Sequence, residues 1–131
     1  MLTTAGKDFA ASAMGDRSGS REAAADYIAL TANSSSPAAG DTTLTSEIAT
    51  ASGGLIRAQA TYAHTGGAST YTLTKTFTAN GNDSLPVTIA KMAVFNASSG
   101  GKMPWESLLS ATATLTAVGD SLQITETITI S

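Results

Sequence analysis

The clearest pattern in this chain is a strict alternation of threonine with large apolar residues in two separate stretches. Residues Thr70–Thr78 read T-Y-T-L-T-K-T-F-T, and residues Leu122–Ile130 read L-Q-I-T-E-T-I-T-I. A period of two predicts β-strands with one face buried and the other in water. Regular threonine arrays can also order water, but such proteins are built from repeats, and this chain shows no repeat. We therefore attribute the threonines to β-propensity.

Further strands are predicted between turn signals rich in Gly, Asn, Asp and Ser. We expect them over Ala25–Ala32, Gly53–His64, Val87–Phe95 and Ala111–Val118. Val87–Phe95 is mostly apolar at both its odd-numbered and its even-numbered positions, so both faces of the strand are apolar. This predicts a place in the middle of a sheet. The stretch Thr42–Ala49 fits either a helical turn or a strand. Seven or eight short strands with frequent turns predict an all-β fold, an antiparallel β-sandwich of jelly-roll-like type.

The first residues follow a different pattern. Apolar positions in Leu2–Met14 approximate helical spacing, which predicts a short helix or arm. Thr3 or Thr4 could cap its start, and Gly15 could stop it. The polar run Asp16–Arg21 then predicts a loop.

These boundaries predict an N-terminal arm over residues 1–21 and a β-sandwich domain over residues 22–131. The arm holds too few apolar residues to form a core of its own. We therefore expect its larger apolar side chains to pack on another subunit or on the outside of the sandwich: Leu2, Phe9 and Met14.

Composition narrows the function classes. Charged residues make up only 13% of the 131 residues, about half the usual share. A free monomer with so few charges is poorly protected against association, so we expect partners to cover much of the surface. The net charge of −3, without a Lys/Arg cluster, argues against nucleic-acid binding. The sequence shows no membrane-length apolar run and no signal-peptide pattern, which predicts a chain made in a cytoplasm and soluble until it assembles.

Few residues could carry chemistry, since the chain has one histidine and no cysteine. His64 lies next to T-G-G without the nucleophile and carboxylate that a general base requires, so we expect a hairpin histidine. The run Asn80–Ser84 (N-G-N-D-S) faintly resembles a calcium loop, but that ion takes six to eight oxygen ligands, and an ordinary turn fits better. We therefore expect no enzyme activity and no catalytic, cofactor-binding or metal-binding residues.

Three residues in β-rich segments need an explanation. Trp105 could anchor a partner or belong to the core, and the preceding Met103 and Pro104 favour an edge or corner. Lys75 and Glu126 fall on the apolar phases of the alternating strands, where an unpaired charge is costly. We predict that Lys75 reaches water at the rim and that Glu126 has a partner across the sheet or across an interface. The candidate interface residues are therefore Leu2, Phe9, Met14, Trp105 and Glu126.

Several short sequence motifs follow one another in an order that resembles the order in one protein family. L-T-T-A-G-K-D-F-A opens the chain, and a strand containing Ala29–Thr31 precedes a Pro/Gly/Asp loop over Pro37–Asp41. A G-G-x-x-R strand entry follows at Gly53–Arg57, and a strand–turn element, A-V-F-N-A-S-S-G-G, lies at Ala93–Gly101. This order resembles small structural proteins of tailed bacteriophages. In that family the last element begins with glycine, which Ala93 replaces here, and the resemblance carries no catalytic residues.

The resemblance implies a bacteriophage virion structural protein that acts through protein–protein contacts. Members are described as head-decoration, tail-fibre or virion structural proteins, so a capsid-decoration, cement-type or tail-associated role is implied. The expected partners are major capsid or tail proteins, within a symmetric homo-oligomer in the virion. The alternative is a tail-fibre module that binds a receptor or glycan through aromatic residues gathered on its loops. An aromatic content of only 5% weighs against this alternative.

Overall fold

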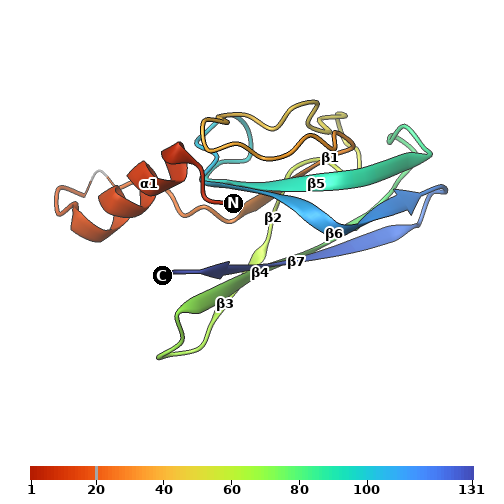
Figure 1. The fold of residues 1–131 in the computed structure, drawn as a ribbon. Helices are drawn as coiled ribbons and strands as arrows, with labels where there is room; N and C mark the ends of the chain where they lie inside the picture. Colours follow the sequence, from red (N-terminus) through yellow and green to blue (C-terminus); the bar gives the residue numbers. More distant parts are fainter. Residues whose placement is uncertain (20) are drawn as a thin grey trace.

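Two antiparallel sheets face each other in the computed structural model, which describes residues 1–19 and 21–131 (Figure 1). Ser20, in the predicted loop Asp16–Arg21, lies outside the described residues. The four-stranded sheet has the order β2-β1-β5-β6, and the three-stranded sheet has the order β3-β4-β7. The predicted antiparallel sandwich with a short N-terminal helix is therefore confirmed. The elements are α1 (Thr4–Gly15), β1 (Tyr27–Thr31), β2 (Ala58–Gln59), β3 (Thr61–His64), β4 (Thr70–Thr78), β5 (Val87–Phe95), β6 (Trp105–Leu115) and β7 (Ser121–Thr129).

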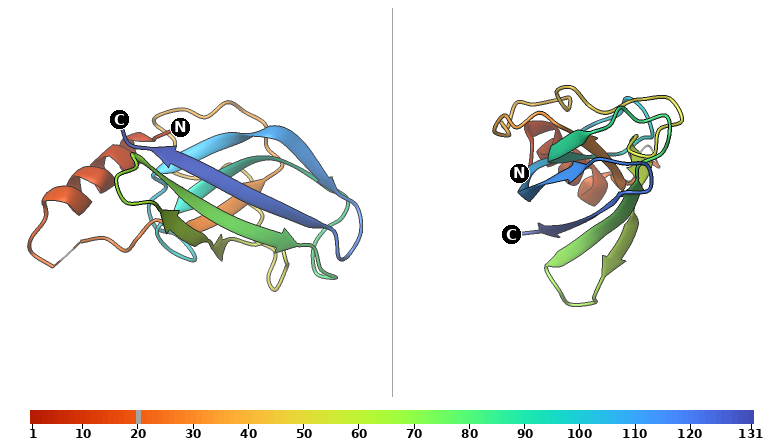
Figure 2. Two further views of the ribbon diagram at one scale, coloured as in Figure 1. Left: turned by 90° about the horizontal axis from the view of Figure 1, so that it is seen from below. Right: turned by 90° about the vertical axis from the view of Figure 1, so that its right-hand side faces the viewer.

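Helix α1 projects from one end of the sandwich, the end at which the C-terminus also lies (Figure 2). Thr3 caps the helix, because its side-chain oxygen accepts a hydrogen bond from the N–H of Gly6 at 3.0 Å. Gly15 is the last helical residue, so the predicted cap and stop are confirmed. Gly6 is buried, and a Cβ there would stand 2.1 Å from the carbonyl oxygen of Pro104. The missing side chain therefore lets the helix approach the segment that leads into β6.

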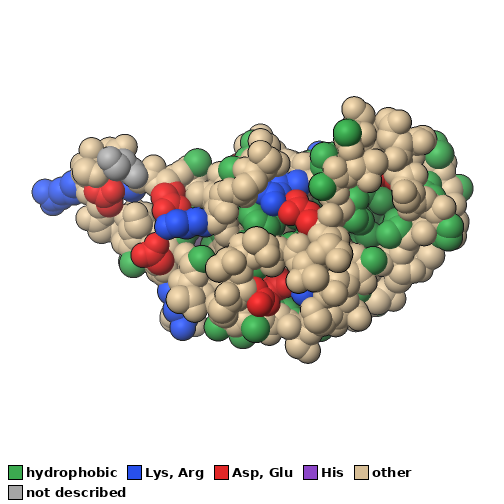
Figure 3. All heavy atoms as spheres, turned by 90° about the horizontal axis from the view of Figure 1, so that it is seen from above, with side chains coloured by type: hydrophobic (Ala, Val, Ile, Leu, Met, Phe, Trp, Pro, Cys, Tyr) green, Lys and Arg blue, Asp and Glu red, His purple; other side chains and the backbone are tan. Residues whose placement is uncertain are grey.

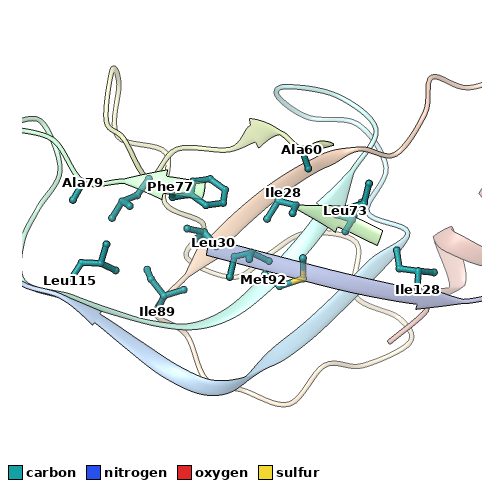
Figure 4. Close-up of a cluster of buried hydrophobic side chains, with 13 residues drawn as sticks. Ile28, Leu30, Ala60, Leu73, Phe77, Ala79, Ile89, Met92, Leu115 and Ile128 are labelled. Carbon is teal, nitrogen blue, oxygen red and sulfur yellow. The ribbon is translucent and has the colours of Figure 1, made fainter. Parts of the chain in front are cut away.

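The core between the sheets follows the alternation read from the sequence. Leu73 and Phe77 of β4 are buried, whereas the threonines around them lie on the other face. Figure 4 shows these side chains pointing toward residues of the opposite sheet, including Ile28 and Met92. Burial of each large apolar side chain stabilises the fold by about 1.5–3 kcal/mol. The buried members of this cluster are Ile28, Leu30, Leu55, Ala60, Leu73, Phe77, Ala79, Ile89, Met92, Val94, Leu115, Ile124 and Ile128.

Strand β5 lies inside the four-stranded sheet, between β1 and β6, as its two apolar phases predict. Its residues from Ile89 to Phe95 are buried on both faces. The face turned away from the second sheet lies beneath the long connection between β1 and β2 (Figure 1). A smaller cluster fills that space: Ala29, Leu44, Ala93, Phe95 and Met103. The ambiguous stretch Thr42–Ala49 belongs to this connection and forms neither a helix nor a named strand.

The strand predicted over Gly53–His64 is wrong in its first half and divided in its second half. Only β2 and β3 are strands, and they belong to different sheets. Ala60 lies between them, buried, and its N–H donates to the carbonyl oxygen of Asp26 at 2.7 Å. The chain therefore crosses from one sheet to the other at Ala60.

Residues 53–57 form a loop because a carboxylate satisfies their backbone. Asp83 accepts hydrogen bonds from the N–H groups of Gly54 at 2.9 Å and Leu55 at 3.3 Å. Gly54 also passes so close to β4 that a Cβ would stand 1.8 Å from the carbonyl oxygen of Thr78. The G-G pair therefore marks a close approach of two backbones, and the strand ladder begins only after it.

The strand predicted over Ala111–Val118 is the second half of β6, which begins at Trp105 and ends at Leu115. Its pairing with β5 shifts register between Ile89 and Lys91. This irregularity breaks the period of two, which is why the sequence pattern hides the first half of the strand.

Candidate functional site

Four of the five predicted interface residues line one apolar groove, which we call the α1 groove. It has a volume of about 310 Å³ and lies between helix α1 and the adjoining end of the sandwich. Leu2, Phe9 and Met14 line it from the N-terminal segment, and Trp105 lines it from the start of β6. Ile130, just after β7, completes the opposite wall. The structure thus gathers residues that are more than 100 positions apart in the sequence.

The side chains around the α1 groove expose unusual amounts of apolar surface. Met14 is 86% exposed, Ile130 62% and Leu2 40%, whereas Phe9 is half-buried. Single exposed apolar residues are ordinary, but a contiguous set around one hollow is typical of an interaction site. The groove therefore combines a hollow with exposed apolar side chains around it.

Polar contacts fix the position of the helix over the sandwich. Lys102 pairs with Asp8 of α1, with 2.8 Å between Nζ and Oδ2, and also with Glu22. The hydrogen bond to Asp8, followed by the one to Glu22, raises the pKa of Lys102 to about 12. Thr3 adds a buried anchor, since its hydroxyl donates to the carbonyl oxygen of Met103 at 2.6 Å. These contacts hold the first turns of the helix in place.

Trp105 connects the two sheets at the base of the groove. It is half-buried against the main core, and its indole N–H donates to Oε1 of Glu126 at 2.7 Å. The partner predicted for Glu126 is therefore a residue of the same chain. The Met1 amino group lies nearby and donates to the carbonyl oxygen of Glu106 at 2.6 Å. Burial lowers the pKa of this amino group, and the carboxylates of Glu126 and Glu106 oppose that shift.

A buried ion pair that the sequence pattern does not predict lies on the outer face of the four-stranded sheet. Lys91 Nζ and Glu106 Oε1 are 2.8 Å apart, and each side chain is 1% exposed. Lys91 also donates to the carbonyl oxygen of Ser35 at 3.1 Å. Burial raises the pKa of Glu106 above its usual value, with the nearby Asp41 carboxylate adding to that effect and Lys91 opposing it. One sequence feature points to this pair: Lys91 is a charged residue within the apolar run Val87–Phe95.

The other residues singled out in the sequence lie in a hairpin, a strand and a turn. His64 is exposed at the end of β3, and its Nδ1 lies 2.9 Å from the carbonyl oxygen of Thr70 across the hairpin. Lys75 stands in the body of the β4–β7 ladder, opposite Ile124 and half-buried, so its predicted position at the rim is wrong. The Asp83 carboxylate accepts backbone N–H groups from two loops. Among residues 1–19 and 21–131, no three His, Asp or Glu side chains gather as a metal site would require.

Charged side chains are sparse on the face over the four-stranded sheet, where acidic and basic groups lie beside one another (Figure 3). Arg57 forms a bidentate pair with Glu47, with distances of 2.8 and 2.7 Å. Its guanidinium also stacks over the ring of Phe95, 3.5 Å from the centroid. Arg57 thus anchors the long connection to the sheet beneath it.

No protein-family model matches this chain. A search of curated proteins also finds no match. In the described part of the chain, no helix is both long and apolar enough to cross a membrane.

Proposed function

We propose that this chain is a bacteriophage virion structural protein, of the capsid-decoration or tail-associated type, that holds neighbouring proteins together. The observation that carries this proposal is the α1 groove, around which Leu2, Phe9, Met14 and Trp105 gather. The order of sequence motifs, which resembles that of small phage structural proteins, supports it, as does the low content of charged residues.

The mechanism is burial of apolar surface at the groove. Full burial of one large apolar side chain contributes about 1.5–3 kcal/mol. Part of that gain is lost to the restricted motion of the associated proteins. An assembly in which many copies each contribute a few kcal/mol becomes stable as a whole, which suits a decoration or tail subunit. Met14 is the side chain with most to gain, because it is the most exposed of the large apolar residues.

The test uses phage particles purified from cells that carry the gene. Mass spectrometry should find the chain in the particles at a fixed copy number, and cryo-electron microscopy should show the α1 end against a neighbouring protein. Particles made with Met14→Ser or Phe9→Ser should contain several-fold less of it. Val118→Ser is the matched control, since Val118 is 65% exposed in the turn between β6 and β7. Recovery of the chain only outside the particles would refute the proposal.

A second candidate function, receptor or glycan binding by a tail fibre, is favoured by one observation. Tyr62 and Tyr71 lie side by side, with ring centroids 5.6 Å apart, and Tyr62 is largely exposed. They line a hollow of about 640 Å³ together with polar side chains that include Arg21 and Asp26. Aromatic faces beside polar groups can bind sugars. Binding of the purified chain to host cells that Tyr62→Ala abolishes and Met14→Ser spares would support this role.

A further inference from the structure

Strand β7 forms an edge of the three-stranded sheet, because β4 pairs with it on one side only. The pairing runs without interruption from Thr70 opposite Thr129 to Thr78 opposite Ser121. Among the described residues, no strand pairs with the other side of β7. An edge of this kind presents a row of backbone N–H and C=O groups that can template another strand.

Two hydrogen bonds at the ends of the ladder determine which residues face the free edge. Ile130 donates its N–H to Ser69, and Ala79 donates its N–H to Asp120. In an antiparallel pair the bonded positions alternate along the strand, so the even-numbered residues of β7 bond to β4. The odd-numbered residues therefore direct their N–H and C=O groups to the free edge. They are Ser121, Gln123, Thr125, Thr127 and Thr129, and each is exposed.

This edge lacks most of the features that natural proteins use to prevent strand addition; the one it has is the inward-pointing charge of Glu126, whose carboxylate is bonded to Trp105. Natural edges carry lysine, proline, bulges or a covering segment. The edge-facing residues of β7 are uncharged, and the register with β4 shows no bulge. Strand β6, in contrast, has a register shift and is bridged at its start by Leu2 opposite Trp105. A groove of about 560 Å³ lies between residues 107–111 of β6 and residues 122–126 of β7, so β6 does not pair with β7 along this stretch.

We infer that β7 pairs with β7 of a second copy of this chain, antiparallel and about a two-fold axis. Centring the axis on Thr125 places Thr125 opposite itself, Gln123 opposite Thr127 and Ser121 opposite Thr129. All of these residues direct backbone groups toward the edge, so N–H and C=O groups of one copy meet their complements on the other. The two three-stranded sheets then form one continuous six-stranded sheet.

A second copy fits this edge because the sequence of β7 is self-complementary. The pairing sets hydroxyl and amide side chains against one another on the outer face, where such pairs are favourable. Glu126, the one charged residue of β7, falls opposite Ile124 of the partner, so like charges do not face each other. The arrangement is also closed, since each copy uses the same edge once. The edge-facing residues of β7 do not line the α1 groove, which β7 reaches only through Ile128 and the following Ile130. The inference does not depend on the function proposed above.

The first test is analytical ultracentrifugation of the purified chain over a range of concentrations. The wild type should form a dimer. Thr125→Lys should raise the dimer dissociation constant by about tenfold or more, because like charges would face each other at the axis. Thr76→Lys is the matched control, since Thr76 is an exposed residue of β4 in the same sheet, one strand away from the edge. It should leave the dimer intact.

The second test uses the absence of cysteine from the chain. Thr125→Cys would bring two thiols together across the axis, where paired Cα atoms are about 5.5 Å apart, within the range for a disulfide. Mild oxidation should convert this variant to a covalent dimer and leave Thr76→Cys monomeric on a denaturing gel. A wild type that stays monomeric at millimolar concentration would overturn the inference. An oligomer that resists Thr125→Lys and yields no Thr125→Cys cross-link would also overturn it, since its copies would then meet through another surface.

Discussion

The indole N–H of Trp105 donates to the Glu126 carboxylate at 2.7 Å and so links the start of β6 to β7 of the opposite sheet. Hydrogen bonds to charged groups contribute about 1.5–3 kcal/mol net, and neutral ones about 1 kcal/mol. Glu126→Gln keeps an acceptor but loses the charge, so we expect the free energy of unfolding to fall by about 1 kcal/mol. Urea denaturation followed by circular dichroism measures this change.

A double-mutant cycle separates this bond from the packing of the indole ring. Trp105→Phe removes the donor and part of the ring, and it should cost more in the wild type than in the Glu126→Gln background. If the two substitutions are strictly additive, the charge of Glu126 does not strengthen the hydrogen bond and the first prediction is wrong.

The buried pair of Lys91 and Glu106 predicts an asymmetry between single and double substitutions. Lys91→Met leaves the Glu106 carboxylate buried without its cation, and breaking such a pair costs about 3–5 kcal/mol. Lys91→Met combined with Glu106→Leu removes both charges and should recover most of that loss. Thermal and urea unfolding of the three proteins test this order. A double variant that is less stable than Lys91→Met alone would contradict it.

The turn between β6 and β7 should make stability depend on acid pH through Asp120. Its carboxylate accepts hydrogen bonds from Thr116 N–H at 2.8 Å and Ala117 N–H at 3.0 Å, and these lower the pKa of Asp120 below its ordinary value of 3.8. A lowered pKa contributes stability that is present above the ordinary value and lost as the pH falls through the folded-state pKa. Asp120→Asn should therefore reduce the difference in melting temperature between pH 6 and pH 2, relative to the wild type.

Much of the fold could be predicted because burial acts on each side chain directly. The alternation of β4 and β7, the two-sided burial of β5 and the Thr3 cap all follow from local patterns. The loop over residues 53–57 could not be predicted, since it depends on Asp83, which is distant in sequence. The sequence likewise gives no signal of the register shift between β5 and β6.

The candidate site was predictable as a set of residues but not as a surface. Leu2, Phe9 and Met14 were identified because they needed burial, and Trp105 because of its size. Their common groove follows from the contact between Gly6 and Pro104, which no periodicity reveals. The partner of Glu126 was hidden for the same reason, since Trp105 lies 21 residues away on a strand of the other sheet.

The contact of Gly6 with Pro104 provides the last prediction. A Cβ at Gly6 would stand 2.1 Å from the carbonyl oxygen of Pro104, so Gly6→Ala must push α1 away from the sandwich. Overpacking of this kind costs about 1–3 kcal/mol. We expect faster amide exchange in α1 and a red-shifted emission from Trp105, the one tryptophan, which lines the widened groove. Gly15→Ala is the control, because a Cβ there meets nothing within 4 Å and alanine favours helix. If both variants behave alike, the close approach at Gly6 does not position the helix, and the α1 groove must be set by other contacts.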